Sequence, residues 1–207
     1  MKNSRTILTA AFVSCIALSA SQAQEFRLGG GYNGSNVQEA GPDQWVGRAG
    51  YQFGADLLLG GHWFVKPGLH FEVRNLNYSV AGVNEDGTPT GTDVEFRYTE
   101  RALRVPLLGG LRLMDPADDP AFNIYLFGGP TALFNLSADL DNDALDVATK
   151  PAQWFLGFGA GLEISFIFLE AGYDVAMSNV FEGDDFDTNP KVNNLYISGG
   201  VRLQLAK

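Results

Sequence analysis

The sequence predicts an all-β fold: an eight-stranded antiparallel transmembrane β-barrel with up-and-down connections. Residues 154–164 alternate apolar side chains on one parity with glycine and charged residues on the other, and this period of two is typical of a β-strand. The alternation resumes over residues 169–176 after a short turn, so the two runs form a hairpin. One face is continuously apolar, and the other carries glycine and isolated charges. Lipid outside and a polar lumen inside explain this pattern directly.

The start of the chain has the features of a secretory signal peptide. Lys2 and Arg5 precede an apolar run over residues 7–20, and Ser21-Gln22-Ala23 supplies the small residues of a cleavage site. We therefore expect residues 1–23 to be a signal peptide and residues 24–207 to be the barrel domain. The alternative, a helix retained as an inner-membrane anchor, is disfavoured because the apolar run is shorter than a normal span.

Composition excludes several other classes of protein. The formal net charge of −10 argues against nucleic acid as a partner, because phosphate binding requires a basic surface. Cys15 is the single cysteine of the sequence and lies in the expected signal peptide, so disulfides and thiol ligands are not expected in the mature chain.

Four strands are expected in the first half of the barrel domain. In each strand the apolar residues share the parity that would face lipid, although Pro67 favours an edge or a bulge in the third. In the fourth strand the apolar set changes parity between Tyr98 and Leu103, which predicts a bulge within residues 99–102. These strands are expected at residues 25–33, 47–59, 65–74 and 94–111.

The second half repeats this organisation, and the connections alternate between long and short. Short turns at Gly60-Gly61, residues 116–120 and Phe166-Ile167 are expected to be periplasmic, whereas long polar loops such as residues 80–92 would face outward. The tryptophans Trp45, Trp63 and Trp154 lie near strand ends, where an aromatic girdle meets the headgroups. The remaining strands are expected at residues 122–135, 154–164, 169–176 and 195–205.

Several of these segments resemble the PorT-like family of small outer-membrane barrel proteins, which are related in architecture to the OmpA and OmpX barrels. The resemblance is carried by residues 103–109, 125–130, 156–162 and 196–202. It implies a location in the bacterial outer membrane and, by the family name, a link to protein secretion. The last strand also resembles the signal read by the barrel-assembly machinery, an expected partner during biogenesis, although it ends without an aromatic residue.

The parity that faces the lumen gathers positive and negative charges in nearly equal numbers, including Glu25 at the start of the first strand. A charge facing a low-dielectric wall is costly without a partner, and an eight-stranded barrel is narrow enough to be filled by side chains. We therefore predict a structural network of ion pairs that plugs the lumen. Its predicted members are Arg27, Arg48, Asp56, Lys66, His70, Glu72, Arg74, Arg104, Arg112, Glu163, Glu170, Asp174 and Arg202.

The sequence gives little support for a catalytic site or a metal site. His70 is the histidine of the inward parity, but no nucleophile-elbow motif places a serine beside it, so a histidine bonded within the lumen network is expected. Two acidic loops contain Asp139, Asp141, Asp143 and Asp146, and Glu182, Asp184, Asp185 and Asp187. The first lacks the glycine and terminal glutamate of a calcium loop. We assign no catalytic residue, metal or cofactor, and weak divalent binding stays open.

The sequence thus favours a non-enzymatic, monomeric outer-membrane barrel that is surrounded by outer-membrane lipid. It would act structurally, or as a scaffold whose outer loops meet a protein partner. Three alternatives remain at this point: a narrow transport channel, an outer-membrane lipid-modifying enzyme that uses His70, and a soluble lipocalin-like barrel with its inside and outside exchanged. The orientation of the apolar parity separates the last of these from the others.

Overall fold

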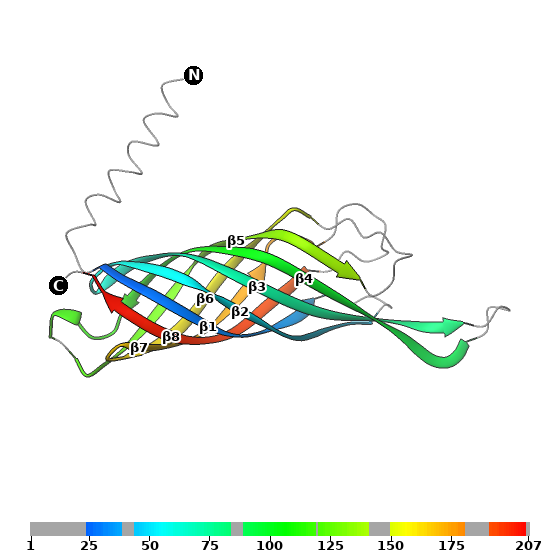
Figure 1. Ribbon diagram of the computed structural model, residues 1–207, viewed down its shortest axis with the longest axis horizontal. Coiled ribbons are helices and arrows are strands. Elements are labelled where there is room, and N and C mark those ends of the chain that lie inside the picture. The colour runs from blue at the N-terminus through cyan, green and yellow to red at the C-terminus, as the bar shows by residue number, and fades with distance from the viewer. Residues whose placement is uncertain are drawn as a thin grey trace, which may run out of the picture.

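A computed structural model describes residues 24–38, 44–83, 89–118, 120–140, 150–180 and 191–205. Its strands form one closed barrel in which each strand pairs antiparallel with the next and β8 pairs with β1 (Figure 1). This confirms the predicted fold class. The expected signal peptide lies outside the described residues. The strands are β1 (Gln24–Gln38), β2 (Gln44–Gly60), β3 (Trp63–Val83), β4 (Pro89–Arg112), β5 (Phe122–Leu140), β6 (Ala152–Ile164), β7 (Ile167–Ala176) and β8 (Lys191–Gln204).

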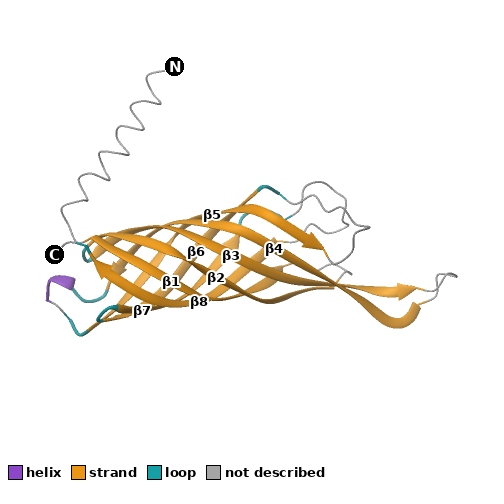
Figure 2. Cartoon of the chain, viewed as in Figure 1, coloured by secondary structure: helices purple, strands orange, loops and turns teal. Residues whose placement is uncertain are grey.

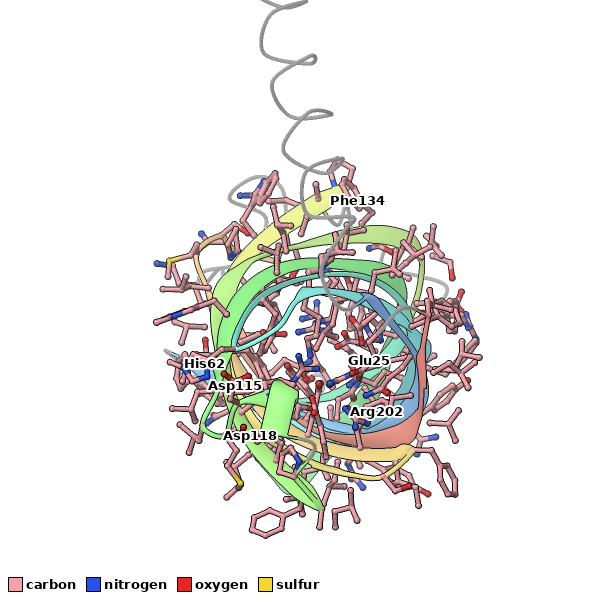
Figure 3. The ribbon with its side chains drawn as sticks, turned by 90° about the vertical axis from the view of Figure 1, so that its left-hand side faces the viewer. Glu25, His62, Asp115, Asp118, Phe134 and Arg202 are labelled. Carbon is pink, nitrogen blue, oxygen red and sulfur yellow. The ribbon has the colours of Figure 1, made fainter. Side chains whose placement is uncertain are left out.

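The apolar parity points outward along the barrel. Leu156 and Leu203 are 48% and 53% exposed, whereas Arg104 and Glu163 are 3% and 2% exposed. In the end-on view Glu25 and Arg202 lie inside the ring of strands and Phe134 lies outside it (Figure 3). A soluble barrel with an apolar core is therefore excluded. Among the described residues, no helix is both long and apolar enough to cross a membrane.

The short turns lie together at one end of the barrel. β1 begins and β8 ends at the end that carries the short helix η1 (Pro116–Asp118) (Figure 2). The β6–β7 turn consists of Ser165 and Phe166, one residue earlier than predicted, and Ser165 has a φ of 53°. Such a left-handed conformation is uncommon for a residue other than glycine and fits a tight two-residue connection.

At the opposite end, β3 and β4 extend beyond their neighbours as a two-stranded ribbon (Figures 1 and 2). The pairing of β2 with β3 ends at Ser79, and the pairing of β4 with β5 begins at Tyr98, whereas β3 and β4 stay paired out to Val83 and Pro89. The predicted loop at residues 80–92 is therefore wrong over its described part. Residues 80–92 are mostly polar or glycine and show no sustained apolar alternation, so the sequence pattern did not reveal these strand ends.

The predicted bulge in β4 is also wrong. The pairing of β4 with β3 is continuous from Tyr98 to Arg104. The extra residue belongs to β5, because Arg101 pairs with Ser137 and Ala102 with Asn135. Tyr98 faces inward at 1% exposure, so the inward parity of β4 is the same from Tyr98 to Arg112. Counting the amphipathic Tyr98 as a lipid-facing residue produced the apparent slip.

Three prolines lie side by side on neighbouring strands of the wall. Pro67 of β3 pairs with Leu107 of β4, and Pro106 of β4 pairs with Thr131, the residue after Pro130 of β5. Each proline removes one backbone donor from the ladder. The described β3–β4 ladder is interrupted between Pro67 and His70, and the described β4–β5 ladder is interrupted just after Pro106. We call this part of β3, β4 and β5 the proline seam, where each proline leaves one backbone donor fewer for the ladder.

Candidate functional site

The lumen near the short turns holds three guanidinium groups around two carboxylates. Glu163 accepts hydrogen bonds from Arg112 at 3.1 Å and Arg202 at 2.7 Å, and also from Arg27. Glu25 accepts from the same three arginines, from Arg27 at 2.6 Å and from the other two at 3.0 Å. These residues come from β1, β4, β6 and β8, so the cluster joins strands across the barrel interior.

A second cluster continues the network toward the middle of the barrel. Glu170 accepts hydrogen bonds from Lys66 Nζ at 2.6 Å and from the Tyr125 hydroxyl at 2.7 Å. The same hydroxyl accepts from Arg27 at 2.8 Å, which links the two clusters. Lys66 Nζ also lies 4.3 Å from the centre of the Phe127 ring, a cation–π contact. The buried charges are thus covered by both carboxylates and aromatic faces.

His70 and Asp56 form a pair in the same region. His70 Nε2 lies 2.9 Å from Asp56 Oδ1, and the two side chains are 13% and 5% exposed. Gly68 permits this approach, since a Cβ atom there would lie 2.1 Å from Asp56 Oδ1. Among the described residues, the hydrogen-bond partner of His70 Nε2 is therefore the Asp56 carboxylate.

Toward the outer end, a third cluster is built around Arg104. Its guanidinium donates to both oxygens of Asp174, at 2.9 and 3.2 Å, and lies 4.6 Å from the centre of the Tyr196 ring. Glu72 accepts from Asn194 at 2.8 Å and keeps its other oxygen 3.9 Å from Arg104 Nε. This bidentate arrangement fixes Arg104 of β4 against Asp174 of β7.

The outermost lumen cluster contains residues that the sequence analysis missed. Arg74 donates to Glu100 and, at 2.9 Å, to Gln153. Gln153 in turn donates to Glu100 at 2.9 Å. Glu100 was missed because β4 was assigned the wrong parity there, and Gln153 lies one residue before the predicted start of its strand. The even positions from Tyr98 to Arg104 would have revealed Glu100 if Tyr98 had been treated as polar.

Between these clusters the described lumen is filled by buried side chains, with Arg27, Lys66 and Tyr125 among the largest of them. The gap bounded by Glu72, Arg74, Arg104, Thr131 and neighbouring side chains has no room for a water molecule. Chemically, the arrangement is a set of paired buried charges that ties opposite strands together. Among the described residues, no group of three or more His, Cys, Asp or Glu side chains could hold a metal ion. The acidic loop residues after Asp139 and the cluster at 182–187 lie outside the described residues.

Arg48 is a correction to the predicted network. Its side chain is exposed, and its neighbour in the sheet is Asn75 on the outward face of β3. A bulge causes this, because Arg48 pairs with Asn75 while Tyr51 pairs with Val73, which leaves one extra residue on β2. The parity therefore changes between Arg48 and Tyr51. The other predicted members of the lumen network all lie in the clusters described above.

A closed antiparallel barrel with an apolar exterior and a charged interior defines an outer-membrane β-barrel protein. The sequence profile of the outer membrane protein beta-barrel domain matches residues 20–182, and the chain belongs to this family. A search of curated proteins found no match.

Several solved structures of bacterial outer-membrane proteins are similar to this chain. OprG from Pseudomonas aeruginosa is 14% identical, with a TM-score of 0.59, covering 88% of this chain and 97% of its own. Ail of Yersinia pestis, solved with the heparin analogue sucrose octasulfate, is 15% identical with a TM-score of 0.46, covering 88% and 99%. Neisserial surface protein A is 12% identical with a TM-score of 0.46, covering 88% and 97%. At 14% identity, the similarity to OprG concerns the fold alone.

Proposed function

We propose that this outer-membrane barrel is a closed, non-enzymatic scaffold that presents its outer loops and the β3–β4 ribbon to a protein partner outside the membrane. The observation that carries the proposal is the packed lumen. Arg27 of β1 reaches Glu163 of β6, and Arg104 of β4 reaches Asp174 of β7, so ion pairs cross the interior at several levels. A water-filled path would require these buried groups to separate, which is costly for paired charges.

Conductance separates the scaffold from a narrow transport channel. Purified barrel inserted into a planar bilayer is expected to give no single-channel steps, with a general porin measured in the same bilayer as the positive control. Insertion is checked by recovering the heat-modifiable folded form from the bilayer sample. Reproducible single-channel conductance steps from the inserted barrel would overturn the proposal.

The β3–β4 ribbon supports an interaction role. The ends of β3 and β4 in this ribbon pair with each other, and over the described residues they pair with no further strand. Their outer edges can therefore accept an added strand from a partner. The PorT-like resemblance would connect this scaffold to protein secretion. A strain lacking the protein is then expected to secrete less. A variant with residues 80–94 replaced by Asn-Gly, which keeps the pairing of Ser79 with Glu95, should fold but fail to restore secretion. Normal secretion by the deletion strain would refute this link and leave the closed-barrel test unaffected.

The lipid-modifying enzyme is the weaker alternative. Such an enzyme would need His70 near a nucleophile at the lipid-facing rim, whereas His70 bonds to Asp56 on the lumen side. A His70→Gln variant is expected to leave the composition of outer-membrane lipids unchanged by mass spectrometry. A lipid species that disappears in this variant and returns with the wild-type chain would favour the enzyme instead.

A further inference from the structure

The outward surface of the barrel carries three exposed arginines close together, just beyond the apolar belt. Arg48 of β2 pairs with Asn75 of β3, which in turn pairs with Thr99 of β4, so these residues form one row on the outer face. Arg97 and Arg101 lie two residues to either side of Thr99 on the same face, and all three arginines are exposed. With strands about 4.8 Å apart and about 3.3 Å per residue, the Cα atom of Arg48 lies about 12 Å from those of the other two.

The centre of this triangle is polar and uncharged. The Thr99 hydroxyl donates to Asn75 Oδ1 at 3.0 Å, and Asn75 Nδ2 donates to the Ala49 carbonyl at 2.9 Å. These bonds hold β2, β3 and β4 in register beneath the three long side chains. The arginines can therefore converge over the Asn75–Thr99 pair without a bulky residue between them.

The charge of this site opposes that of the whole chain. The chain carries a formal net charge of −10, yet the site gathers three guanidinium groups. Arg101 also contacts Asp139, an exposed carboxylate on β5.

The level of this site along the barrel matches that of the lipid headgroups. The next outward residues toward the membrane are apolar or aromatic, with Tyr51 and Phe53 of β2 and Phe134 of β5 at 49%, 56% and 40% exposure. Aromatic residues of this kind mark the boundary between hydrocarbon and headgroups. Arginines immediately beyond them lie where lipid phosphates lie, and the guanidinium fork matches phosphate oxygens in geometry and charge.

We propose that Arg48, Arg97 and Arg101 form a binding site for a phosphate group of an outer-leaflet glycolipid. The β2 bulge builds the site, because it turns Arg48 outward to join the two arginines of β4. The proposal depends on the outer-membrane location and not on the scaffold role.

Native mass spectrometry of the folded barrel in detergent tests the site. The titrants are lipid A carrying its phosphates and the same lipid with its phosphates removed. The triple variant Arg48→Gln, Arg97→Gln and Arg101→Gln is expected to bind phosphorylated lipid A about 100-fold more weakly, since each basic residue near an anionic lipid surface contributes roughly fivefold in affinity. The matched control is Lys191→Gln, which removes an exposed charge from β8 at the same end of the barrel.

Three results would overturn the site: equal binding by the triple variant and the wild type, equal binding of the phosphate-free lipid, or an equal loss in Lys191→Gln. Heat-modifiable gel migration verifies that each variant is folded. If the triple variant does not fold, the single variant Arg97→Gln decides. It is expected to bind phosphorylated lipid A roughly fivefold more weakly than the wild type does. Raised salt should likewise weaken binding of this lipid by the wild type. An unchanged affinity in that variant contradicts the proposal.

Discussion

Glu163 gives the sharpest test of the lumen network. It is 2% exposed and accepts hydrogen bonds from Arg27, Arg112 and Arg202. The substitution Glu163→Gln keeps the shape of the side chain but removes its charge. The three arginines would then share Glu25, while Arg27 would also keep Glu170.

The expected loss of unfolding free energy is about 3 kcal/mol. Removing one partner of a buried ion pair costs about 3–5 kcal/mol, and the retained amide oxygen of Gln places the change at the lower end. Urea titration of the barrel in phospholipid vesicles measures it, with the folded fraction read from gel migration and tryptophan fluorescence. The surface control is Asp139→Asn, whose partner Arg101 is 45% exposed, and its expected effect is about 0–1 kcal/mol.

A double-mutant cycle identifies the cause of the loss. Adding Arg112→Gln to Glu163→Gln removes one of the cations that lost Glu163 as a partner, so the double variant should lose less than the sum of the two single losses. A Glu163→Gln variant no less stable than Asp139→Asn would refute the reasoning. Strictly additive losses would show that the charges do not act as a pair.

Three further predictions test other parts of the barrel. Glu100→Gln should lower the unfolding free energy by about 3 kcal/mol in the same titration, because Arg74 loses a buried carboxylate; a change below 1 kcal/mol would contradict this. Ala160→Arg on the lipid face should cost about 2–4 kcal/mol, whereas Ala160→Leu should not, and equal effects would count against the membrane orientation. By hydrogen exchange, the amide of Gly68 in the proline seam should exchange faster than that of Phe71, which keeps its pairing with both β2 and β4; equal protection of the two amides would argue against the seam.

The sequence was informative where the barrel contacts lipid. Along β6, Leu156 must face hydrocarbon and Glu163 must avoid it, so a single register satisfies the strand. The same constraint placed Arg27, Lys66 and Asp174 in the lumen. Their individual partners could not be read from the sequence, because pairing depends on which strands face each other across the interior.

The predictions failed where the strands leave the lipid. Near Arg48 and Glu100 both faces of the sheet can be polar, so alternation no longer distinguishes inside from outside. A bulge of one residue then changes the outcome without changing the composition. The part of the ribbon beyond Ser79 was missed for the same reason, since residues 80–92 show no sustained apolar alternation.

Arg104 and Arg48 lie in two environments that differ in how the charge of an arginine can be stabilised. Arg104 lies behind a wall of backbone and lipid, where an unpaired charge is costly, and it is accordingly held by both oxygens of Asp174. Arg48 lies at the level of the headgroups, where water and anionic lipid can serve as counter-charge. The β2 bulge decides between these settings, because without its extra residue Arg48 would share the inward parity of Gln52 and Asp56. A local irregularity in the ladder therefore converts a lumen position into an outward-facing one at the level of the headgroups.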